Sequence, residues 1–88
     1  MVKTISFKSL PENWIKEFNG LKSNTIRKCD NKKDVRFKVL NEFVEGKYFV
    51  LHIEIINTET KEMFYRVVTD VTQYGDLYII SWEHRYNI

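Results

Sequence analysis

The residues best suited to chemistry in this chain lie in a short segment that follows a glycine. Lys22, Thr25 and Arg27 come directly after Gly20. In an extended segment alternate side chains share a face, so Thr25 and Arg27 point in the same direction. Lys22 joins them if the chain bends after the glycine. A guanidinium fork and an ammonium group beside a hydroxyl are suited to bind a phosphate or the polar edge of a base.

Two more cations extend this candidate site. Lys28 follows directly in the chain, and Arg66 lies in the middle of a later predicted strand. An aromatic side chain such as Tyr65 or Trp82 could stack on a base. The predicted ligand-binding residues are Lys22, Thr25, Arg27, Lys28 and Arg66.

An ordinary structural role is open to the same cations. Arg27 would then pair with an acid such as Asp70 or Glu54, and the stem of Lys22 would lie over Trp14. The surroundings of Arg27 decide between a binding site and a set of structural contacts.

The distribution of charge is uneven and is compatible with an anionic partner. Residues 22–38 carry seven cations and two anions, a net charge of +5, whereas 1–21 carry +1 and 39–88 carry −4. A concentrated basic segment raises the local concentration of anions and suits a phosphate. The alternative is a solvated segment whose lysines keep the protein soluble.

Composition excludes several classes of protein. A chain of 88 residues with 43% hydrophobic and 15% aromatic residues predicts one domain, 1–88, with its own core. The longest apolar stretch has four residues, as in 48–51, and 1–8 lack the apolar region of a secretory signal. Cys29 is the only cysteine, and the two histidines are far apart in the chain. We therefore expect a cytoplasmic protein with no disulfide, metal site, cofactor or membrane partner.

An opening strand within 1–8 and a helix over 11–19 are predicted at the N-terminus. Ser9 precedes Glu12 at the spacing of a capping box, and Gly20 provides the stop. The side chains predicted on the buried face are Trp14, Ile15 and Phe18, and those predicted elsewhere are Glu12, Lys16 and Glu17.

Residues 34–45 fit two kinds of element. Apolar side chains alternate over 35–39 as in a strand, but over 37–44 they follow the three-and-four spacing of an amphipathic helix. Asp34 as N-cap and Gly46 as stop favour the helix.

The second half predicts a three-stranded antiparallel meander. Its strands are 48–56, 63–71 and 77–82, separated by turns at 57–62 and 72–76. The fold class is therefore α+β, a small antiparallel sheet or reduced barrel with one or two packed helices. The aromatic residues expected mostly in the core are Trp14, Phe18, Phe37, Phe43, Phe49, Phe64 and Trp82, and those expected on the surface are Tyr74 and Tyr78.

The segment GLKSNTIR at 20–27 resembles the signature of ASCH domains, which are PUA-like β-barrels. In that family a short helix ends at a glycine, a lysine follows two residues later, and a strand then carries a threonine and an arginine. The resemblance covers about 10–28, with a looser similarity in 67–71 and 77–82. It implies a single PUA-like domain. The same segment is also similar to sequences of small proteins from phages and mobile elements.

The leading functional prediction is binding of RNA or a nucleotide-like ligand through the basic Lys22, Thr25 and Arg27 surface. The resemblance implies an alternative, an amidohydrolase acting on an acylated nucleoside such as acetylcytidine. Lys22 and Thr25 would then be catalytic, with Glu54 the one strand-centre candidate for a third, glutamate position. We favour binding over catalysis.

A third possibility is a phage or mobile-element protein that binds a host protein. The acidic half, 39–88, would approach a basic partner. An exposed edge of a small sheet also makes a homodimer plausible.

Overall fold

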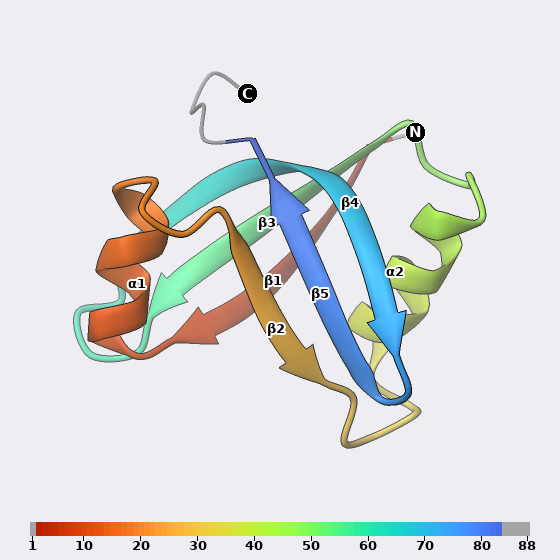
Figure 1. Cartoon of the computed structure of the whole chain (residues 1–88), viewed down its shortest axis with the longest axis horizontal. Helices are drawn as coiled ribbons and strands as arrows, with labels where there is room; N and C mark the ends of the chain where they lie inside the picture. Colours follow the sequence, from red (N-terminus) through yellow and green to blue (C-terminus); the bar gives the residue numbers. More distant parts are fainter. Residues whose placement is uncertain (1, 84–88) are drawn as a thin grey trace.

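The computed structural model describes residues 2–83 and contains two helices and five strands along the described chain (Figure 1). This confirms the predicted α+β class. The elements in chain order are β1 (Val2–Ser9), α1 (Pro11–Phe18), β2 (Asn24–Lys28), α2 (Val35–Val44), β3 (Val50–Asn57), β4 (Met63–Tyr74) and β5 (Leu77–Trp82).

The five strands form a mixed sheet in the order β1-β3-β4-β5-β2. The predicted antiparallel meander is confirmed as β3, β4 and β5. β1 adds in parallel to β3, and β2 pairs antiparallel with β5. The sheet is thus mixed rather than purely antiparallel. It is an open sheet, not the reduced barrel that was the other prediction. β1 and β2 form its two edges, and among residues 2–83 no ladder joins them to close a barrel.

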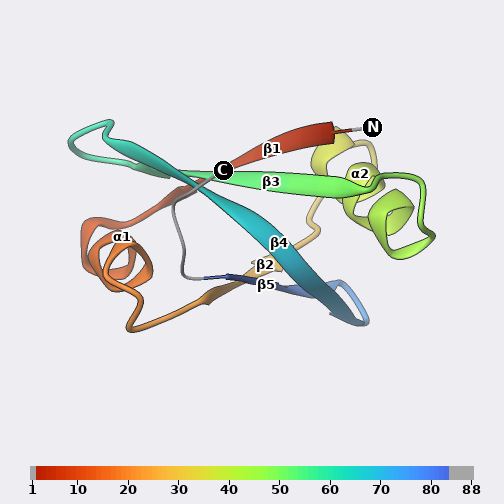
Figure 2. The same ribbon diagram turned by 90° about the horizontal axis from the view of Figure 1, so that it is seen from above.

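A bend in β4 divides the sheet into two halves. The first part of β4 pairs with β3 and the second with β5, with a register shift between Val68 and Asp70. Such an irregularity bends a strand and increases its twist. Figure 2 shows the result: β4 crosses between a layer of β1 and β3 and a layer of β5 and β2, with α1 and α2 at opposite ends.

The core fills the space between these layers. Leu51, Ile53 and Ile55 alternate along β3 and are fully buried, as the pattern predicts. Phe49 precedes β3 and is 92% exposed, so its predicted place in the core is wrong. Tyr78, predicted on the surface, is instead buried: its ring packs on Phe37 in the core, and its hydroxyl donates to Asn41 Oδ1 at 3.0 Å. The other large aromatic residues in the core are Phe7, Trp14, Phe37, Phe64 and Trp82.

The helices form where the sequence predicts them, but α1 begins differently. Its N-cap is Leu10, with no side-chain cap, so the predicted capping box is wrong. Ser9 is unable to cap the helix because it ends β1, paired with Asn57. Gly20 follows α1 with φ +82°, a conformation that glycine adopts without strain. α2 confirms the helical alternative for 34–45.

Two residues of α1 have the opposite exposure to the one predicted, since Ile15 was expected on the buried face and Glu17 was not. Ile15 is 48% exposed, whereas Glu17 is 1% exposed. Glu17 follows Trp14 by three residues, which places both on the face that packs against the sheet. In α2, Asp34 caps the helix by accepting from the backbone N–H of Arg36 at 3.0 Å. No helix among residues 2–83 is long and apolar enough to span a membrane.

Candidate ligand-binding site

The Arg27 side chain links the two edges of the open sheet. From β2 its Nη1 donates to the Lys8 carbonyl at 2.7 Å, and its Nη2 donates to Ser9 Oγ at 2.8 Å, both on β1. Its Nε donates to Thr25 Oγ1 on its own strand at 2.9 Å. The shared face of Thr25 and Arg27 is therefore confirmed. Arg27 replaces, with side-chain hydrogen bonds, the ladder that would close a barrel.

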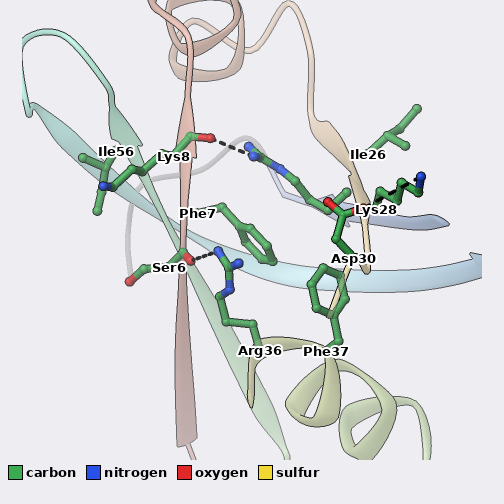
Figure 3. Close-up of a pocket in the computed structure, with 10 residues that line it drawn as sticks. Ser6, Phe7, Lys8, Ile26, Lys28, Asp30, Arg36, Phe37 and Ile56 are labelled. Atoms are coloured by element: carbon green, nitrogen blue, oxygen red, sulfur yellow. Dashed lines mark hydrogen bonds and ion pairs between the residues drawn. The ribbon is translucent and has the colours of Figure 1, made fainter. Parts of the chain in front are cut away.

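A second arginine reaches β1 from α2. Arg36 Nη1 donates to the Ser6 carbonyl at 3.1 Å, while its Nε and Nη2 bond to the carboxylate of Asp34. The guanidinium carbons of Arg36 and Arg27 lie 4.4 and 5.0 Å from the ring centroid of Phe7. These are cation–π distances, so the buried ring supports both cations. Figure 3 shows Phe7, Arg36 and Phe37 turned toward one another.

These side chains line a cavity of about 640 Å³ between β1, β2 and α2, which we call the basic cavity. Its volume falls in the range of small-molecule sites, roughly 300 to 1,000 Å³. Four of its lining residues are cations and one, Asp30, is an acid. Its full lining is Ser6, Phe7, Lys8, Ile26, Arg27, Lys28, Asp30, Arg36, Phe37 and Ile56.

The cations of the basic cavity differ in how firmly they are held. Burial lowers the pKa of Arg27, and the charge of Glu17 opposes that shift. The hydrogen bond to Asp34 raises the pKa of Arg36. An arginine starts so far above neutrality that both guanidiniums stay charged. Lys28 is exposed, 3.8 Å from Asp30 and 3.9 Å from Asp76, and such surface pairs exchange readily with solvent ions.

A smaller cavity of about 240 Å³, the Glu17 cavity, adjoins the basic cavity. Lys8, Ile26 and Arg27 line both cavities. Glu17 Oε2 lies 3.9 Å from Lys22 Nζ, an ion pair longer than a hydrogen bond. Within the described part of the chain, neither carboxylate oxygen of Glu17 has a hydrogen-bond partner. The lining of the Glu17 cavity is Lys8, Ser9, Leu10, Asn13, Glu17, Lys22, Thr25, Ile26 and Arg27.

The structure brings together four of the five predicted ligand-binding residues. Lys22, Thr25 and Arg27 line the Glu17 cavity, and Arg27 and Lys28 line the basic cavity. Arg66 is the exception and a correction, since it is fully buried. Its guanidinium donates to the Tyr65 carbonyl at 2.8 Å and to the Phe18 carbonyl, at the end of α1, at 3.1 Å, a structural role.

The predicted stacking aromatics lie outside both cavities. Trp82 is 4% exposed and belongs to the core, whereas Tyr65 is exposed but lines neither cavity. The aromatic rings of the basic cavity are instead those of Phe7 and Phe37.

The predicted acidic partners of Arg27 have other contacts. Glu54 accepts a hydrogen bond from Ser6 Oγ at 2.8 Å, and Asp70 accepts one from Thr72. Glu54 is therefore held at β1, and Glu17 is the acid that shares a cavity with Lys22 and Thr25.

Three residues that line the two cavities were not among the predicted site residues, namely Phe7, Glu17 and Arg36. Arg36 lies in the basic segment 22–38, and Phe7 lies in the predicted opening strand within 1–8. A signal for Glu17 exists in its spacing of three from Trp14, which marks a shared helical face.

No group of three or more metal-binding side chains occurs among residues 2–83. Comparison with protein-family models gives no match for this chain, and none of the curated proteins matches it. The resemblance to ASCH domains stays a prediction.

Proposed function

We propose that this protein binds a phosphate-bearing nucleotide ligand, single-stranded RNA or its nucleotides, in the basic cavity. The observation that carries the proposal is that two guanidiniums, those of Arg27 and Arg36, lie over the Phe7 ring in one cavity whose lining has four basic residues and a single acid. These basic residues are Lys8, Arg27, Lys28 and Arg36.

The arginines and Lys28 would bind a phosphate in different ways. Arg27 and Arg36 are fixed by carbonyls of β1 and by the Phe7 ring, so little side-chain entropy is lost when an anion binds. A guanidinium has five N–H donors. Arg27 uses each of its three nitrogens once in the fold, which leaves N–H groups over for an oxyanion. Lys28 is exposed and supplies a mobile point charge.

The test is fluorescence anisotropy with a short labelled oligouridylate across a salt series. For single strands each neutralised phosphate contributes about −0.7 to the slope of log K against log salt. Contacts with two or three phosphates predict a slope of roughly −1.4 to −2.1. Lys28→Gln is expected to weaken binding and to make the slope shallower by about 0.7.

The matched control is Lys3→Gln, which removes the same charge from an exposed position of β1 outside the cavity lining. It should leave both affinity and slope unchanged. The proposal is refuted if no binding occurs at the lowest salt, or if Lys3→Gln weakens binding as much as Lys28→Gln does.

A second candidate, an amidohydrolase for an acylated nucleoside, is favoured by one observation. Glu17 lines the same cavity as Lys22 and Thr25, so a lysine, a threonine and a glutamate occur together. It ranks second because the Thr25 hydroxyl accepts from Arg27, and among the described residues Glu17 makes no hydrogen bond to it. Incubation with N4-acetylcytidine, with chromatographic detection of cytidine, tests this candidate. Release that persists in Lys22→Met would exclude it.

A further inference from the structure

The buried carboxylate of Glu17 is the polar group that the proposed phosphate site does not use. Glu17 is 1% exposed, and within the described chain neither of its oxygens has a hydrogen-bond partner. A buried charge without hydrogen bonds is costly, and the Lys22 ammonium at 3.9 Å compensates only by charge. A carboxylate in this state has the capacity to accept two parallel N–H donors.

The neighbours of Glu17 define what kind of group could bind there. Lys22 is a donor on a flexible stem whose side chain is 34% exposed, so it can rotate away from the carboxylate. The cavity around it, about 240 Å³, is smaller than the basic cavity and suits one ring system rather than a whole nucleotide. Arg27 lines both spaces, so the two cavities are adjacent, and one nucleotide with its phosphate in the basic cavity would place its base beside Glu17.

We propose that the Glu17 cavity is a guanine-binding subsite, with Glu17 accepting from N1–H and the 2-amino group and Lys22 donating to O6. This inference rests on the proposed nucleotide binding and names the base. Guanine presents two adjacent donors followed by an acceptor on its Watson–Crick edge. Adenine, cytosine and uracil each offer only one donor group there, so a carboxylate pairs with them less well.

When guanine binds in this way, Glu17 and Lys22 no longer pair with each other, and each pairs with the base instead. The Lys22 ammonium leaves Glu17 and moves to the carbonyl oxygen of the base, while the two N–H groups of the base replace it. Glu17 thereby gains the hydrogen bonds that it lacks without the ligand, and no proton is transferred.

The test is isothermal titration calorimetry with GMP, IMP and AMP. IMP differs from GMP only by the missing 2-amino group, which bonds to a charged acceptor in this mode. We expect GMP to bind about tenfold or more tightly than IMP, and AMP to bind more weakly than GMP. Equal affinities for the three nucleotides would overturn the guanine subsite and leave the phosphate site standing. Failure of all three nucleotides and of oligouridylate to bind would overturn both.

Two variants separate the roles of the two side chains. Glu17→Gln keeps the shape of residue 17 and is expected to reduce the ratio of GMP to IMP affinity to about one. Lys22→Met removes the O6 contact common to both ligands, so it should weaken GMP and IMP alike and preserve their ratio. A ratio unchanged in Glu17→Gln would overturn the inference. Should Glu17→Gln fail to fold, the comparison of nucleotides on the unaltered chain still decides.

Discussion

Replacing Arg27 tests whether a single side chain holds the two edges of the sheet together. Arg27→Met removes hydrogen bonds of 2.7, 2.8 and 2.9 Å to Lys8, Ser9 and Thr25, and also the contact with the Phe7 ring. A hydrogen bond to a charged group contributes about 1.5 to 3 kcal/mol, and a cation–π contact about 0.5 to 1.

The expected loss is smaller than the sum of these contributions. Burial disfavours the Arg27 guanidinium, which is why its pKa is lowered, and methionine relieves that cost. We expect the free energy of unfolding to fall by about 2 to 4 kcal/mol. A domain of this size has roughly 4 to 13 kcal/mol of stability in total, so the loss is large.

Urea denaturation followed by tryptophan fluorescence measures this loss, because Trp14 and Trp82 are both buried. Lys28→Met is the matched control, since the next residue of the same strand is exposed and should change stability by less than about 0.5 kcal/mol. Arg27→Lys keeps the charge without the fork and should lose nearly as much stability as Arg27→Met. A loss below about 1 kcal/mol in Arg27→Met would refute the bridging role.

Two further predictions concern α2 and β3. The Arg36 hydrogen bond lowers the pKa of Asp34, so its contribution is present above about pH 4 and is lost as pH falls through the lowered pKa. Asp34→Asn should therefore cost at most about 1 kcal/mol near neutral pH, a difference that disappears toward about pH 2 in urea titrations. Leu51→Ala should cost about 2 to 5 kcal/mol, whereas Phe49→Ser should cost almost nothing; equal losses would contradict the observed exposures.

Elements with strong local patterns could be predicted from the sequence. The alternation over 50–57 and the turns around it define β3, β4 and β5, because period-two patterns and turn residues are local properties. The helix stop at Gly20 is local too. The partner of β1 is not a local property, and a parallel ladder to β3 has no mark in the sequence of either strand.

The part of the candidate site that lies on β2 could be predicted from the sequence. Thr25 and Arg27 share a face by alternation, and the bend after Gly20 brings Lys22 to the same cavity. Arg36 comes from a helix, and its contact with β1 depends on how α2 packs. Arg66 is the fourth residue of β4, and whether such a cation faces solvent or the core is decided by tertiary packing alone.

The predicted homodimer remains a prediction, and the structure limits where it could form. The Ser6 and Lys8 carbonyls of β1 accept from Arg36 and Arg27, so this edge is partly occupied by side chains. Such occupation disfavours pairing with another strand.

Amide and arginine-side-chain NMR spectra recorded during titration with oligouridylate test the binding cavity most directly. Ligand binding between β1, β2 and α2 predicts shifts at Phe7, Arg27, Lys28 and Arg36, including the Nε–H signals of both arginines. Lys3, on the same strand as Phe7 but outside the cavity lining, should not shift. Shifts confined to residues outside the basic cavity, or none at all, would contradict binding there.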